Sequence, residues 1–90
     1  MITAFIMINA QRDRIAAAAQ EILRLNGIAE IYSVAGQYDL IAVARVRESG
    51  DLARLVTEDM ITVEGITNTN TLIAFRQFSK FDLERMFGLE

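Results

Sequence analysis

A short polar segment, Gly36-Gln37-Tyr38-Asp39, gathers the most chemically useful residues of this chain. It places a glycine, a hydrogen-bonding ring and a carboxylate between two strongly apolar stretches. Asp39 could accept hydrogen bonds from the ammonium group of a small ligand, while exposed backbone amides around Gly36 hold a carboxylate of that ligand. The alternative is a plain hairpin turn, in which Gly36 provides a positive φ and Asp39 is simply solvated. Spacing alone leaves both interpretations open.

A second polar segment, residues 67–71, alternates threonine with asparagine before an apolar continuation over 72–75. Side chains alternate between the two faces of a strand, so Thr67, Thr69 and Thr71 are expected to share one face. That face could line a polar, solvated groove. The alternative is ordinary β-propensity with hydroxyl groups on an exposed edge, and this too stays open.

The residue types that are missing narrow the possible chemistry. The chain contains neither histidine nor cysteine, so it lacks thiol catalysis, disulfides, thiolate metal ligands and the commonest general base. No calcium-ligand spacing, phosphate-binding loop or catalytic motif is present either. We therefore expect no metal and no cofactor, and any catalysis would have to use carboxylates, tyrosines, arginines or hydroxyls; we assign no catalytic residue.

Charge and hydropathy exclude two classes of partner. The net charge is −3 and the nine basic residues are scattered, so no basic stripe exists to bind nucleic acid directly. The apolar runs are shorter than the roughly 18 residues of a membrane span, and the N-terminus lacks the positive segment of a signal peptide. We expect a cytoplasmic protein that contacts neither nucleic acid nor membrane.

Hydrophobic periodicity places the polar segments in a β-α-β-β-α-β chain. This order is that of the ferredoxin-like α+β fold, an antiparallel four-stranded sheet with two helices on one face. Gly36-Gln37 is predicted to be a two-residue hairpin turn. A stripe beginning at Ile15 predicts a first helix that ends at Asn26-Gly27, and a second helix runs from Gly50 to Met60. The predicted strands cover residues 2–8, 28–35, 38–46 and 66–75.

The composition predicts that one face of this sheet meets another subunit. Hydrophobic residues make up 52% of the 90-residue chain, above the usual range of about 45–50%. The two helices cover one face of the sheet, yet the strands are apolar on both faces. Large exposed apolar surfaces mark interfaces, so we expect a homodimer formed through the uncovered face.

The C-terminal residues predict a separate short helix. Ser79-Lys80-Phe81-Asp82 is similar to a capping box, and Leu83, Met86 and Phe87 follow on one helical stripe. We therefore divide the chain into one domain over residues 1–77 and a helical tail over 78–90, and expect the tail to serve packing or assembly.

The two polar segments together resemble the ligand-binding (RAM) domain of the Lrp/AsnC transcription regulators. The turn carries glycine-x-tyrosine-aspartate, and residues 65–71 carry glycine-hydrophobic-x-x-threonine-x-threonine. The resemblance covers residues 1–77 and includes the element order. It implies dimers formed through the sheets, often assembled into octamers as tetramers of dimers, with an amino acid or similar effector bound between dimers.

The resemblance also implies which residues bind the effector and what the chain lacks. Regulators of this family carry an N-terminal helix-turn-helix domain, whereas here the first predicted strand begins at residue 2, so we expect a stand-alone effector module. Such a module could influence transcription by assembling with a full-length regulator. The positions that match the family's effector site are Gly36, Gln37, Tyr38, Asp39, Thr69 and Thr71, with Tyr32 added one strand step earlier.

The leading hypothesis is thus a non-catalytic module that senses amino acids. One alternative is a small cofactor-free enzyme of the monooxygenase or isomerase type, since dimeric ferredoxin-like proteins include these. Such enzymes place polar residues between sheet and helices, where this sequence has mainly Ile, Val, Leu and Ala. Another alternative is a purely structural partner of a larger regulator.

Overall fold

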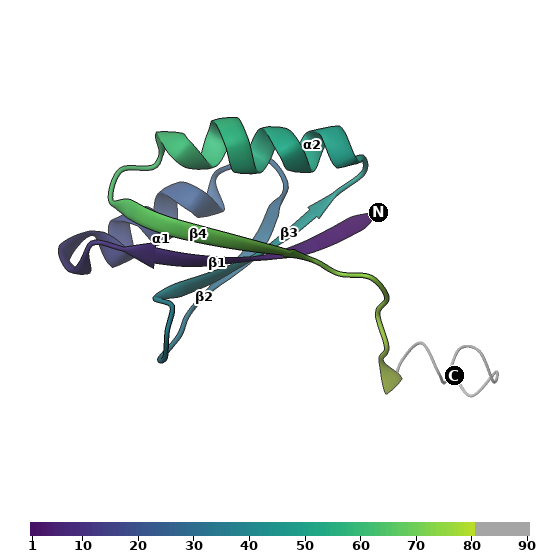
Figure 1. The fold of residues 1–90 in the computed structure, drawn as a ribbon, viewed down its shortest axis with the longest axis horizontal. Helices are drawn as coiled ribbons and strands as arrows, with labels where there is room; N and C mark the ends of the chain where they lie inside the picture. Colours follow the sequence, from purple (N-terminus) through teal and green to yellow (C-terminus); the bar gives the residue numbers. More distant parts are fainter. Residues whose placement is uncertain (81–90) are drawn as a thin grey trace.

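Strands β3 and β1 lie at the centre of a four-stranded antiparallel sheet in the order β2-β3-β1-β4. This is a computed structural model, and it describes residues 1–80. Both helices cover the same face of the sheet (Figure 1), which confirms the predicted ferredoxin-like architecture. The strands are β1 (Ile2–Ala10), β2 (Ile28–Ser33), β3 (Leu40–Val46) and β4 (Ile66–Ile73). The helical elements are η1 (Arg12–Arg14), α1 (Ile15–Leu23), α2 (Ser49–Arg54), the π-helical turn η2 (Leu55–Asp59) and the 3-10 turn η3 (Met60–Thr62).

The hydrophobic core lies between the sheet and the helices. Alternate residues of β1, namely Ala4, Ile6 and Ile8, are completely buried, and they pair with the buried alternate residues of β3. Ala18 and Ile22 of α1 close this core from above, and both are completely buried. Because each strand alternates its side chains, the intervening residues of β1 and β3 point to the other face of the sheet.

The second helical run departs from a regular α-helix at its centre. In a regular helix, Asp59 would follow Leu55 on the same stripe four residues later. The wider π-helical turn brings Met60 to that stripe instead, and Leu55 and Met60 are 1% and 2% exposed. The predicted helix over 50–60 is therefore confirmed, with an irregularity that keeps the Asp59 carboxylate out of the core.

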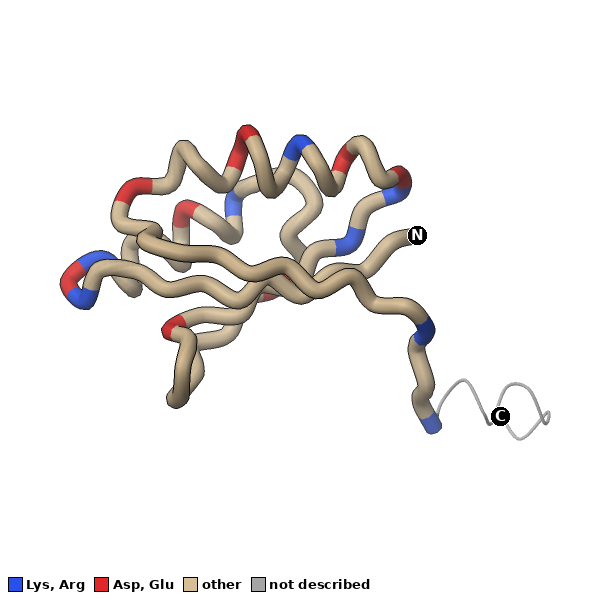
Figure 2. Tube along the Cα trace, viewed as in Figure 1, with Lys and Arg blue, Asp and Glu red and all other residues tan. Residues whose placement is uncertain are grey.

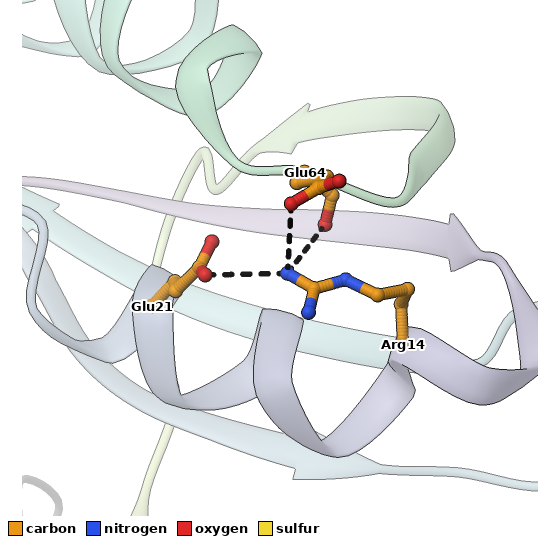
Figure 3. A network of polar contacts seen from close by, with 3 residues as sticks. All are labelled: Arg14, Glu21 and Glu64. Atoms are coloured by element: carbon orange, nitrogen blue, oxygen red, sulfur yellow. Dashed lines mark hydrogen bonds and ion pairs between the residues drawn. The ribbon is translucent and has the colours of Figure 1, made fainter.

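Arg14 connects the start of α1 to the loop that leads into β4. Its Nη2 lies 3.2 Å from Oε1 of Glu21 and 3.7 Å from Oε2 of Glu64 (Figure 3). Gly65 packs closely on the same side chain: its φ is +97°, and a Cβ there would lie 2.6 Å from Cβ of Arg14. This contact fixes the point at which β4 begins.

The face of the sheet opposite the helices exposes apolar side chains, and we call it the open face. Phe5, Tyr32 and Leu72 on this face are 40%, 51% and 53% exposed. Figure 2 shows that charged residues gather on the helices and loops, and β1 and β4 contain none. By register and alternation, the open face comprises Thr3, Phe5, Met7, Asn9, Glu30, Tyr32, Ile41, Val43, Arg45, Asn68, Asn70 and Leu72.

The predicted tail helix stays a prediction, as does the domain boundary at residues 77 and 78. That helix falls mainly on residues 81–90, which lie outside the described residues. Strand β4 ends at Ile73, two residues before its predicted end.

Candidate functional site

The connection between β2 and β3 is longer than the predicted two-residue turn. The backbone N–H of Val34 donates to the carbonyl of Asp39 at 3.1 Å, so four residues, 35–38, form the loop. Gly36 has a φ of +135°, which residues with side chains rarely adopt, while nothing lies within 4 Å of its missing Cβ. Backbone conformation, and not crowding, therefore requires glycine at this position.

Asp39 fastens the loop to the end of β1 with both its backbone and its side chain. Its N–H donates to the carbonyl of Ile8 at 2.9 Å, and its carboxylate Oδ2 accepts the backbone N–H of Ala10 at 2.9 Å. Ala10 lies where the pairing of β1 with β4 shifts its register, directly after Asn9. The prediction of a two-residue turn is wrong because these bonds hold Asp39 against β1, so that the connection closes between Val34 and Asp39.

Two asparagines that sequence reasoning did not select also hold the loop. Nδ2 of Asn9 donates to the carbonyl of Gln37 at 2.9 Å, and Nδ2 of Asn70 donates to the hydroxyl oxygen of Tyr38 at 3.2 Å. The second bond joins the loop to the edge strand β4 across the end of β1. For Asn9 the available signal was a polar residue inside an otherwise apolar strand, whereas Asn70 lies among other polar residues of β4 and does not stand out.

Thr69 and Thr71 lie on the other side of β4 from the loop. They pair with Ile8 and Ile6, whose side chains are completely buried beneath the helices, whereas Asn70 belongs to the open face. Thr69 lines a hollow of about 350 Å³ between β4 and the end of the second helical run. The structure thus does not bring the threonines to the loop within one chain.

Tyr32 lies on β2, the opposite edge of the sheet from β4. A hydrogen bond to Glu30, reinforced by the charge of that carboxylate, raises the pKa of Tyr32 above its usual value of 10. Since the hydroxyl of Tyr38 points to the other edge strand, the two tyrosines are not joined in this chain.

Among residues 1–80, no three carboxylates form a group that could hold a metal ion. In the same range, no helix is long and apolar enough to cross a membrane.

Comparison with known proteins assigns the family. The sequence model of the Lrp/AsnC ligand binding domain matches residues 3–83, which is most of the chain. The chain belongs to the Lrp/AsnC family. It is 36% identical over 73 residues to an uncharacterized HTH-type transcriptional regulator of Pyrococcus furiosus, a match that covers 81% of this chain and 49% of that protein. The chain spans about half the length of the curated relatives it matches.

Solved structures show the same fold. A protein from Thermus thermophilus is 40% identical, with a TM-score of 0.83 over 89% of this chain and 100% of that chain. A feast or famine regulatory protein from M. tuberculosis, complexed with L-methionine, is 24% identical, with a TM-score of 0.68 over 89% of this chain and 54% of that chain. The second likeness shows the fold alone. Family and fold are therefore as the sequence predicts.

In this Lrp/AsnC domain the predicted site residues form two separate halves. One half is the loop with Tyr38 and Asp39, held by hydrogen bonds to β1 and β4. The other half is the pair Thr69 and Thr71, which faces the helices from the edge strand. A molecule that contacts both halves needs either to pass around the edge of β4 or to lie between two chains.

Proposed function

We propose that this chain is a non-catalytic, cytoplasmic effector-binding module that senses an amino acid and dimerises through its open face. The observation that carries the proposal is the fixed position of the Asp39 carboxylate, one oxygen of which accepts the N–H of Ala10. A carboxylate held in this way suits an ammonium group, because charge-assisted hydrogen bonds are roughly twice as strong as neutral ones. The L-methionine bound to the M. tuberculosis relative supports an amino acid as the class of effector.

We place the effector site between subunits. Thr69 and Thr71 face the opposite side of β4 from the loop, and β4 is an edge strand that a neighbouring subunit can approach. Asp39 of one dimer would pair with the effector's ammonium, while the threonine hydroxyls of the next and amides near Gly36 hold its carboxylate. Tyr38 would form a wall of the side-chain pocket. Effector sites between neighbouring dimers are consistent with assembly into a tetramer of dimers.

A full-length Lrp/AsnC regulator is a second proposed partner. Its ligand-binding domain would have a sheet of the same design, so mixed assembly through the open face gives this chain a route to transcription without direct contact with DNA. If no effector binds to this chain, its role in such a mixed assembly would be purely structural.

The interior of the domain favours a binding role over catalysis. None of the described residues that are buried is polar or charged, so the buried core between sheet and helices holds no acid, base or nucleophile. A cofactor-free monooxygenase or isomerase would need such groups in that space.

Calorimetry with the twenty amino acids tests the proposed site, using Asp39→Asn as the variant. Asparagine retains an oxygen that can accept the N–H of Ala10, but it removes the charge. We expect affinity for the effector to fall by roughly tenfold or more, while the free energy of unfolding falls by less than about 0.5 kcal/mol. Asp51→Asn is the matched control, because that carboxylate also accepts one backbone N–H, from Glu48 at 3.3 Å, at the start of α2. Binding of none of the amino acids, or equal affinity in Asp39→Asn, contradicts the proposal.

A further inference from the structure

The last described residues, 75–80, leave the body of the domain on the side of the open face (Figure 1), and we call them the arm. The pairing of β4 with β1 ends at Ala74, whose N–H donates to the carbonyl of Thr3 at 2.8 Å. Beyond this bond Phe75 is fully exposed and Phe78 is 80% exposed. The arm thus carries two large aromatic rings that its own domain does not cover.

The arm and the open face enclose a hollow of about 400 Å³. Thr3, Phe5 and Arg45 line it from the sheet, and Phe75 and Phe78 line it from the arm. Met1, Ala74, Arg76 and Gln77 complete the lining, so three of its nine residues are phenylalanines. A hollow of this kind can receive apolar side chains from a second protein, because aromatic rings dominate the energetics of interfaces.

The exposed rings of the arm and the exposed apolar side chains of the open face match each other, which indicates that this second protein is another copy of the chain. The arm carries two cationic residues, Arg76 and Lys80, and Cζ of Arg76 lies 6.0 Å from the ring centre of Phe78. Among the described residues, Glu30 is the only acidic residue on the open face, and its ion pair with Arg45 is long, at 3.9 Å. Since Arg45 lies on the same face and pairs with Glu30, the open face carries no net charge and offers mainly an apolar surface to an arm that carries two exposed rings.

We infer that two copies of this chain exchange arms, so that Phe75 and Phe78 of each pack on the open face of the other. A two-fold axis makes this arrangement self-complementary, since each chain supplies one arm and one receiving face. The hollow beside Phe5 would then be filled by the partner, and the arm would continue the sheet-to-sheet interface beyond the sheet. This inference rests on the dimer proposed above, but it does not depend on effector binding.

The strength of the dimer gives the first test. We expect the double variant Phe75→Ala/Phe78→Ala to raise the Kd of the dimer roughly 100-fold or more in sedimentation equilibrium, because four rings are lost per dimer. The matched control is Leu23→Ala/Ile61→Ala, which removes two apolar side chains that are 49% and 74% exposed on the helical elements. The control should leave the Kd unchanged. An equal Kd in wild type and the arm variant overturns the inference.

The emission of a tryptophan introduced into the arm gives the second test. The chain contains no tryptophan, so Phe78→Trp provides a single fluorophore. We expect emission at short wavelength in the dimer and at long wavelength in the monomer, obtained by dilution or by adding Phe5→Asp. Short-wavelength emission in both states means that the arm packs on its own domain, and long-wavelength emission in both means that it is free; either overturns the inference. If the chain is a dimer but the introduced indole stays solvated, the exchange of arms is wrong and the proposed dimer stands. If the wild-type chain is a monomer, both the exchange of arms and the proposed dimer are wrong.

Discussion

The two ends of the open face are built in opposite ways. At the loop end, Asn9, Asn70 and the N–H of Ala10 each form a hydrogen bond with residues 37–39, which connect β2 to β3. At the arm end, Phe75 and Phe78 project from the domain with their rings exposed. One end satisfies its polar groups within the chain, while the other leaves apolar surface without cover.

This difference fits the two kinds of partner proposed above, a small ligand and a second subunit. A small polar ligand gains most from groups that are already fixed, because ordering them on binding would cost free energy. A second protein gains most from apolar surface that it can remove from water. The loop end meets the first requirement and the arm end meets the second.

The largest expected effect is the loss of the dimer on introducing a charge at the arm end. Phe5 is 40% exposed, so Phe5→Asp should leave the monomer folded. In the proposed interface it buries an unpaired carboxylate, which costs about 4 kcal/mol, or roughly 1,000-fold in Kd. Sedimentation equilibrium measures this change. Ile61→Asp, at an exposed position in η3, is the control, and an unchanged Kd for Phe5→Asp would refute the use of the open face.

The next largest effect is expected on stability, from a substitution that strains the backbone of the loop between β2 and β3. Gly36→Ala should lower the free energy of unfolding by about 1–3 kcal/mol, because alanine is strained at a φ of +135°. Gly50→Ala in α2 is the control: no positive φ and no neighbour within 4 Å oppose it, so it should stabilise by up to about 1 kcal/mol. Urea unfolding of both variants measures this difference in the free energy of unfolding. Equal stabilities would mean that the loop conformation is not fixed.

Loss of the hydrogen bond between the Asp39 carboxylate and the N–H of Ala10 should lower the free energy of unfolding slightly less. Asp39→Ala leaves the N–H of Ala10 without its acceptor, which we expect to cost about 1–2 kcal/mol of unfolding free energy. Asp39→Asn retains an acceptor and should cost less than about 0.5 kcal/mol. If the two variants are equally destabilised in urea, then the charge, and not the hydrogen bond, holds the loop.

The smallest effect is the coupling between Tyr38 and Asn70. Their hydrogen bond is exposed, so a double-mutant cycle of Tyr38→Phe and Asn70→Ala should give a coupling of about 0.5–1 kcal/mol. The same cycle with Tyr32→Phe in place of Tyr38→Phe should give no coupling, since Tyr32 lies on the opposite edge strand. A coupling of equal size in both cycles would show that the tyrosines act through a general change in the sheet.

The sequence predicts the elements of the fold well because their periodicity is strong. It does not predict the four-residue loop, because that length depends on bonds from Asp39 to Ile8 and Ala10, about 30 residues away. Nor does it predict the π-helical turn, which decides whether Asp59 or Met60 faces the core. In both cases a tertiary contact overrides a local pattern.

The candidate site is predicted in part for a similar reason. Alternation correctly separates Thr69 and Thr71 from Asn70, but it does not say which set faces the helices. Only the pairing with β1 assigns the threonines to the helix side and Asn70 to Tyr38. The roles of Asn9 and Asn70 could not be predicted from the sequence, because their hydrogen-bond partners lie 28 and 32 residues away along the chain.

The strand order β2-β3-β1-β4 has a consequence for synthesis of the chain. Strand β1, one of the two central strands, leaves the ribosome first and the edge strand β4 leaves it last, so one side of the uncharged strand β1 stays unpaired in the nascent chain. Asn70, which holds Tyr38, and the arm with its two phenylalanines both emerge with or after β4. A growing chain therefore cannot present its arm to a neighbour until the residues that complete its own sheet have been made.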